Sequence, residues 1–160
     1  MTKMTGKAML VVALSMAFAL AIACKTAPSS PPAPAGLEPT TPEEAALKTI
    51  YERYYTDLIL DGAGTYTVRS GDTLAHIARS SEYHSGYYYP IIMLASKDII
   101  LDPDKIQPGM VLTVPDLQKN LDNTRARAGI KNFLGEVAKI EDDRNRHETA
   151  NGLRELADSL

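Results

Sequence analysis

The pattern of hydrophobic residues changes its period within one short stretch, residues 66–78, which read Y-T-V-R-S-G-D-T-L-A-H-I-A. The first three residues are β-formers in alternation, whereas the last five have apolar residues at the i, i+3, i+4 spacing of a helix. Gly71 suits the positive φ of a tight reversal, and Asp72 or Thr73 can accept hydrogen bonds from the first helical turn. The sequence therefore predicts a stiff turn that joins a strand directly to a helix.

Helix signals and turn signals continue to alternate after this junction. A Tyr-rich loop covers residues 80–88, and residues 89–96 return to helical spacing. Turn-forming residues dominate 101–109, and M-V-L-T-V at 110–114 reads as a second strand. The order strand, helix, helix, strand predicts an α+β fold, because the two strands can pair as an antiparallel sheet covered by helices on one face.

Residues 66–115 resemble the LysM domain, and the segment corresponds to about a third of the chain. The opening stretch quoted above and the closing D-P-D-K-I-Q-P-G-M-V-L-T-V-P both stand where that family has them, at a separation that fits. The resemblance implies a βααβ fold that binds glycans containing N-acetylglucosamine. In bacteria that glycan is most often peptidoglycan, and the family binds it without chemistry.

The resemblance also implies a shallow groove between two walls, which would hold a sugar through backbone hydrogen bonds to its acetamido groups and through apolar contact with its ring faces. We call the wall from the strand-to-helix turn the first wall and the wall before the second strand the second wall. In this sequence they are Gly71, Asp72, Thr73 and Leu74, and Ile99, Ile100, Leu101 and Asp102. The alternative is that the turns require Gly71 and Asp72 even without a ligand.

Six apolar residues of the LysM-like segment are predicted to form its core: Leu74, Ile77, Ile92, Ile106, Val111 and Val114. Three others, Leu94, Ile99 and Leu101, hold positions that are often polar in relatives. If exposed, they would form an apolar patch of the kind that marks an interface. Ser96 stands where Asn is frequent, which should weaken a turn contact without abolishing the fold.

Four tyrosines lie close together before and at the start of the second predicted helix: Tyr83, Tyr87, Tyr88 and Tyr89. Tyr89 matches a position that is commonly Trp in the family, and we expect it to pack inside. The rings of the other three could stack on sugars, although the simpler interpretation is that they cover the core.

The sequence offers no constellation for catalysis, so we predict that the protein is not an enzyme. Three aspartates, Asp98, Asp102 and Asp104, could suggest a cation site, but their spacing is more typical of a turn. The histidines, His76, His84 and His147, lack ligand spacing and are expected on the surface. We predict neither a metal nor a cofactor.

Segments on both sides of residues 66–116 have helical patterns. T-P-E-E at 41–44 is a capping box with proline at the first helical position, and it opens a predicted helix over 42–60 within a flanking segment 42–62. The C-terminal region 120–160 starts a helix at Asp122 or Asn123 and continues to about Arg144, before a less regular terminal helix. We expect the two flanking helices to pair and cover the apolar patch; alternatively they bind an envelope protein or another copy.

The first 23 residues have the features of a signal peptide, with Lys3 and Lys7 before an apolar run that is short for a membrane span. The end of that run resembles the lipobox of bacterial lipoproteins, with the single cysteine, Cys24, as the residue to be lipidated. Ala21 stands where Leu is usual. Ordinary cleavage after Ala23 is the alternative, and both interpretations predict export.

Residues 24–41 form a Pro-rich tether, and its 16 residues 25–40 would reach at most roughly 50 Å if extended. Without the signal peptide the chain has 15 basic and 20 acidic side chains, a net charge of −5 that disfavours nucleic acid as a partner. Lys25 is not the Asp that favours retention in the inner membrane, so the outer membrane is favoured.

Together these features predict a non-catalytic, peptidoglycan-binding lipoprotein of the cell envelope, anchored to a membrane through Cys24 and facing the periplasm. The alternative is an envelope scaffold whose LysM-like core recruits a protein partner and does not bind glycan. The apolar residues of the second wall favour that alternative.

Overall fold

The computed structural model describes residues 37–160. The predicted signal peptide, Cys24 and the larger part of the tether lie outside the described residues. Within residues 37–160, no helix has the length and apolar character that crossing a bilayer requires.

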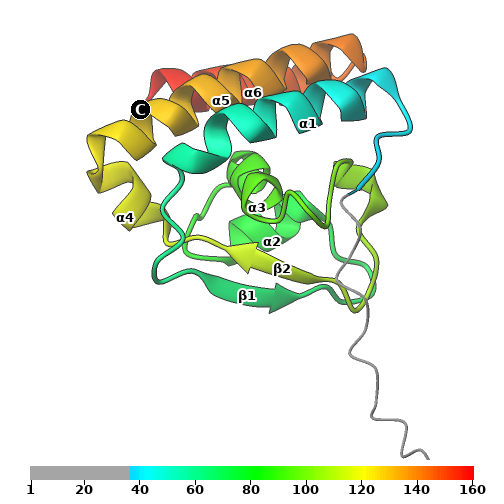
Figure 1. Ribbon diagram of the computed structural model, residues 1–160, viewed down its shortest axis with the longest axis horizontal. Helices are drawn as coiled ribbons and strands as arrows, with labels where there is room; N and C mark the ends of the chain where they lie inside the picture. Colours follow the sequence, from blue (N-terminus) through cyan, green and yellow to red (C-terminus); the bar gives the residue numbers. More distant parts are fainter. Residues whose placement is uncertain (1–36) are drawn as a thin grey trace, which may run out of the picture. The chain divides into compact units, whose positions relative to one another are not determined.

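A two-stranded antiparallel sheet forms one side of the molecule (Figure 1). Its strands are β1 (Gly64–Thr67) and β2 (Val111–Val114), paired so that Tyr66 lies opposite Leu112. Between them in sequence come α2 (Leu74–Ser80) and α3 (Tyr89–Ala95), which cover one face of the sheet. The predicted α+β class and the βααβ order are confirmed.

The strand-to-helix turn has the predicted backbone, with Gly71 at a φ of 87°. The two polar residues that follow have separate roles. Asp72 accepts hydrogen bonds from the Arg69 N–H at 2.8 Å and the Tyr66 hydroxyl at 2.9 Å, which ties the turn to the end of β1. Thr73 caps α2 by accepting from the His76 N–H at 3.1 Å. Both bonds hold the turn stiff.

A second layer of helices packs on the side of α3 that faces away from the sheet (Figure 1). It consists of α1 (Pro42–Tyr54), α5 (Thr124–Asp143) and α6 (His147–Asp158). The predicted flanking helix is shorter than 42–60, because a 3₁₀ turn, η1 (Tyr55–Asp57), follows α1. Asn123 caps α5, one of the two predicted choices, by accepting from the N–H groups of residues 125 and 126.

One further short helix, α4 (Leu117–Asp122), was not predicted. The side chain of Asn120, fully buried, accepts from the Ile59 N–H at 2.8 Å and donates to the Ile59 carbonyl at 2.9 Å. This pair of bonds satisfies the backbone just before β1 and fixes α4 to it.

The expected pairing of α1 with the C-terminal helix is confirmed. The Tyr51 and Tyr54 rings of α1 lie 6.0 and 5.8 Å from the Phe133 ring of α5. Leu94 and Leu101 are buried in the same core cluster and Ile99 packs against it. The apolar patch is therefore covered by the protein's own helices, as we expected.

The predicted core is wrong at Val111, which is 50% exposed. Val111 lies opposite the exposed Thr67 in the sheet, on the face that carries no helices. Because side chains alternate along a strand, Leu112 instead points to the helices and is fully buried. Ser96, expected to weaken a turn, is buried and accepts a 2.9 Å hydrogen bond from the Thr113 N–H.

Candidate functional site

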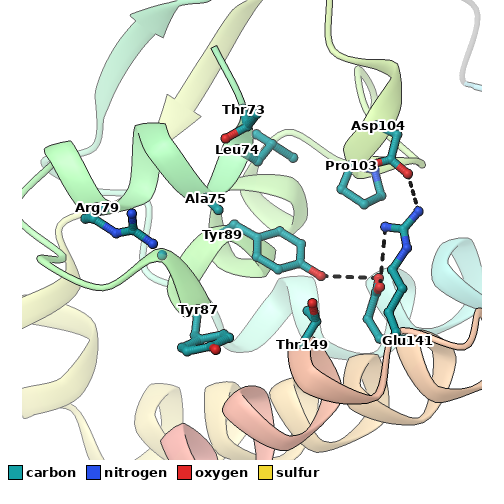
Figure 2. A pocket seen from close by; sticks show the side chains of 12 residues that line it. Thr73, Leu74, Ala75, Arg79, Tyr87, Tyr89, Pro103, Asp104, Glu141 and Thr149 are labelled. Carbon is teal, nitrogen blue, oxygen red and sulfur yellow. Dashed lines mark hydrogen bonds and ion pairs between the residues drawn. The ribbon is translucent and has the colours of Figure 1, made fainter. Parts of the chain in front are cut away.

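A cavity of about 270 Å³ opens between α2 and a second turn that contains the 3₁₀ helix η3 (Pro103–Lys105) (Figure 2). We call it the Thr73 cavity. Its sides come from the LysM-like segment on one hand and from the α5–α6 junction on the other. The lining residues are Thr73, Leu74, Ala75, Arg79, Gly86, Tyr87, Tyr89, Pro103, Asp104, Glu141, Arg146 and Thr149.

The first wall contributes two of its four predicted residues to this cavity. Thr73 and Leu74 line it, and the Leu74 side chain also belongs to the core, with 2% of its surface exposed. Gly71 and Asp72 are not among the lining residues; they form the turn behind Thr73.

The second wall lies elsewhere. Ile99, Ile100, Leu101 and Asp102 line a different hollow of about 190 Å³, whose opposite side is formed by residues 37–44. We call it the Leu37 hollow. Ile100 and Leu101 are buried in the core. The structure thus does not bring the two predicted walls to one cavity: Pro103 and Asp104, not residues 99–102, face the first wall across the Thr73 cavity.

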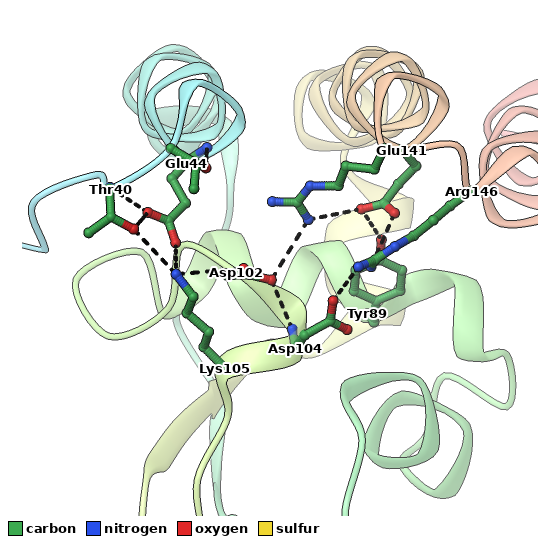
Figure 3. Close-up of polar contacts among 10 residues, drawn as sticks. Thr40, Glu44, Tyr89, Asp102, Asp104, Lys105, Glu141 and Arg146 are labelled. Atoms are coloured by element: carbon green, nitrogen blue, oxygen red, sulfur yellow. Dashed lines mark hydrogen bonds and ion pairs between the residues drawn. The ribbon is translucent and has the colours of Figure 1, made fainter.

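A buried carboxylate lies at the end of the Thr73 cavity that is formed by α5 and α6 (Figures 2 and 3). Glu141 is 1% exposed and accepts a 3.2 Å hydrogen bond at Oε1 from the Tyr89 hydroxyl. Its two charge partners are Arg144, with Nη1 3.6 Å from Oε1, and Arg146, with Nη1 3.5 Å from Oε2. Arg146 also pairs with Asp104 of η3. These contacts hold the C-terminal helices to the LysM-like segment.

Two properties of this cluster affect what it can bind. Burial, followed by the nearby Glu141 charge, raises the pKa of the Tyr89 hydroxyl well above its ordinary value, so the hydroxyl stays protonated and keeps donating. Glu141 Oε2, in contrast, has no hydrogen-bond partner within residues 37–160. Its contact with Arg146 is close enough for charge attraction but lacks hydrogen-bond geometry.

Residues 37–44 form a second polar cluster beside the second wall (Figure 3). The buried Glu44 carboxylate accepts from the Lys105 ammonium and the Thr40 N–H, both at 2.5 Å, and from the Thr40 hydroxyl at 2.7 Å. These bonds, Lys105 first, lower the pKa of Glu44 to about 2. The end of the predicted tether is therefore attached to the folded part, where Leu37 also packs against the core.

Tyr87 is held at the mouth of the Thr73 cavity by α6. The ring is 38% exposed, and a Cβ added to Gly152 would lie 2.2 Å from its Cζ atom, so the ring rests directly on the helix backbone. Figure 2 shows Tyr87 between η2 (Gly86–Tyr88) and α6. Tyr83 and Tyr88 are buried, as the simpler interpretation expected, and Tyr89 packs inside.

Comparison with known proteins gives two similarities. The protein-family model described as LysM domain matches residues 66–115. Residues 66–115 form a LysM domain. The chain is also similar to the potassium binding protein Kbp of Escherichia coli O6:H1 (strain CFT073), with 45% identity over 51 residues. This match covers 32% of the present chain and 34% of that protein. No solved structure gives a significant match.

The sequence did not reveal the part of the site that lies outside the LysM domain. Glu141, Arg146 and Thr149 come from the α5–α6 junction, which no motif marks. One signal was present: Glu141 follows Val137 by four residues and Leu134 by seven, so a carboxylate stands on the apolar stripe of its helix. A charge in that position predicts a buried, partnered group.

The remaining polar candidates are accounted for by other contacts. Asp102 caps η3 and lies 3.8 Å from both Lys105 and Arg144, and Asp104 pairs with Arg146. All three histidines are exposed, as expected. Among residues 37–160 there is no group of three or more His, Cys, Asp and Glu side chains placed to hold a metal ion.

Proposed function

We propose that the protein binds a glycan containing N-acetylglucosamine, in the form of peptidoglycan, in the Thr73 cavity of its LysM domain, without chemistry on it. The observation that carries the proposal is the open cavity between Thr73 and Leu74 on one side and Pro103 and Asp104 on the other. Its volume of about 270 Å³ is slightly below the range for small-molecule sites, roughly 300–1,000 Å³.

The lining suits a sugar. Pro103 offers apolar contact to a ring face, while Thr73, Tyr89 and Asp104 supply polar groups at the margins. Because the turn before Thr73 is stiff, the site is largely formed before binding, which reduces the entropy lost with the ligand.

Cys24 remains the proposed point of lipidation, and the periplasmic side of a bacterial membrane, with the outer membrane favoured, remains the proposed location. Attachment to a membrane would raise the local concentration of the domain near the wall, so one domain of modest affinity would be enough to link the two. Mass spectrometry of the full chain from the membrane fraction tests this: an acylated Cys24 peptide supports it, and an unmodified peptide refutes it.

The apolar second wall, which favoured a protein scaffold without a ligand, is covered by the protein's own α1 and residues 37–44. The apolar character of the second wall is therefore explained without a protein partner. Potassium binding belongs to the name of the relative, and the match covers only 34% of that protein, so we do not propose it for this chain.

A sedimentation experiment tests glycan binding. Full-length protein in mild detergent is mixed with insoluble peptidoglycan sacculi, and wild type is compared with Ala75→Trp, whose indole would fill the Thr73 cavity. His76→Trp is the matched control, because His76 is exposed on the same helix and does not line the cavity.

We expect wild type and His76→Trp to sediment with the sacculi and Ala75→Trp to remain in solution, with all three showing similar thermal unfolding. Equal sedimentation of the three proteins would place the binding outside the Thr73 cavity. If the wild-type protein also remains in the supernatant, wall binding is refuted altogether.

A further inference from the structure

Three of the twelve residues that line the Thr73 cavity lie outside the LysM domain. Glu141, Arg146 and Thr149 come from α5, α6 and the turn between them, and Tyr87 owes its position to the backbone of α6. The C-terminal helices therefore extend the site beyond the groove that a LysM domain has by itself.

This end of the cavity contains a buried hydrogen-bond acceptor that is not satisfied. Oε2 of Glu141 has less than 1 Å² of exposed surface and no hydrogen-bond partner in the described part of the chain. Leaving a buried charged acceptor unsatisfied is costly, so a donor from a ligand would be favoured there. Figure 2 shows the Tyr89 and Thr149 hydroxyl groups at the same end of the cavity. The Tyr89 hydroxyl donates its hydrogen to Glu141 and can accept a further bond, and the Thr149 hydroxyl can accept or donate one.

The charges that line the cavity indicate the kind of ligand. Arg79 and Arg146 balance Asp104 and Glu141. A polyanion or a free cation would meet as much repulsion as attraction, whereas a neutral group rich in hydroxyl and amide N–H donors would meet none. The exposed ring of Tyr87 adds an aromatic surface at the mouth, and saccharide rings pack on such surfaces through their apolar faces.

We propose that the α5–α6 end of the Thr73 cavity is an additional saccharide subsite, in which a third sugar of the bound chain packs on Tyr87 and donates a hydroxyl or amide hydrogen to Glu141 Oε2. This inference rests on the proposed glycan binding. It adds that the C-terminal helices make the protein sensitive to the length of the sugar chain.

Gly152 offers a way to disturb the subsite without touching the LysM domain. In Gly152→Ala, the added methyl group would meet the far end of the Tyr87 side chain. Because that side chain can move, the ring is displaced while the helix is retained. Gly135→Ala is the matched control, because Gly135 lies in α5 and a Cβ added there meets nothing within 4 Å. Tyr87→Ala removes the ring, and Tyr87→Phe keeps it.

The measurement is calorimetric titration of the full-length protein in detergent with N-acetylglucosamine oligomers of two to six units. For wild type, Gly135→Ala and Tyr87→Phe, we expect affinity to rise with oligomer length. For Gly152→Ala and Tyr87→Ala, we expect that gain to shrink by about 3- to 10-fold, while the affinity for the dimer falls less. Glu141→Gln should reduce the gain in the same way, because its neutral carbonyl accepts a weaker bond.

Equal length dependence in all variants would overturn the subsite. So would a loss that appears only with peptide-bearing wall fragments, because the peptide would then occupy this end. If wild type binds neither the oligomers nor sacculi, the proposed function fails as well. If wild type binds sacculi and the dimer but its affinity does not change with oligomer length, only the additional subsite fails.

Discussion

The two walls that the LysM resemblance pairs around one groove have different environments in this protein. The first wall is open, and Thr73 faces the cavity while Gly71 is exposed. The second wall is covered: Leu101 is 6% exposed, and residues 37–44 form the opposite side of the hollow beside it. The module therefore leaves one turn open and uses the other to join its flanking helices.

This difference shows how the domain is extended without losing its site. The covered wall supplies the apolar surface on which α1 packs, and the open wall gains new neighbours, Glu141 and Arg146, from the C-terminal helices. Substitutions in the covered wall should thus act mainly on stability, and those in the open wall should have smaller effects that local backbone geometry explains.

The largest effect is expected in the covered wall. Leu101→Ala should lower the free energy of unfolding by about 2–5 kcal/mol, because it leaves a cavity in the shared core. Urea denaturation of the full-length protein measures this. Val111→Ala, at an exposed apolar position, is the control and should change stability by less than about 0.5 kcal/mol. Similar losses for both would show that the wall is not a packed interface.

A smaller loss is expected at the turn of the open wall. Gly71→Ala should cost about 1–2 kcal/mol, because its φ of 87° is unfavourable for a residue with a Cβ, although no atom lies within 4 Å of the added methyl group. Gly64→Ala, at a strand position without positive φ, should cost less. Equal midpoints in thermal unfolding would contradict a strained backbone at Gly71.

The cap of α2 should contribute less again. Thr73→Val keeps the shape of the side chain but removes the oxygen that accepts from His76, so a loss of about 1 kcal/mol is expected. Thr73→Ser retains the oxygen and should lie close to wild type in the same denaturation assay. A Thr73→Ser protein as unstable as Thr73→Val would mean that the methyl group, not the cap, is responsible.

A pH-dependent effect, specific to the covered side, comes from Glu44. Its pKa is about 2 in the folded protein and ordinary in the unfolded chain, so its ion pair stabilises the fold above about pH 4.5 and is lost as the pH falls toward 2. Unfolding curves at pH 6 and pH 3 should diverge more for wild type than for Glu44→Gln. Parallel pH dependence in both proteins would exclude this carboxylate as the source.

Elements with strong local signals could be predicted from the sequence. The strand-to-helix turn, the Thr41 capping position and the stripe of α5 all rest on neighbours a few residues apart, and the structure has each of them. Helix ends were less certain: η1 continues α1 in a different geometry, which hydrophobic spacing does not distinguish from more helix.

The site was harder to predict because it depends on contacts between distant residues. Thr73 was predicted from the domain alone, whereas Glu141 and Arg146 reach the cavity only through the packing of α5 and α6. The resemblance also placed residues 99–102 in the groove, whereas in this protein residues 37–44 lie over them. Local periodicity carries no information on such pairings.

The contacts of Thr40, Glu44 and Lys105 have a mechanical consequence. If Cys24 is fixed in a membrane while the domain holds the cell wall, tension between the two enters the fold at residue 37. It then meets two lysine contacts, from Lys48 to the Leu37 carbonyl and from Lys105 to Glu44, before it can reach the hydrogen bonds of the sheet. Force would peel away the amino-terminal helix first and leave the glycan-holding turns intact.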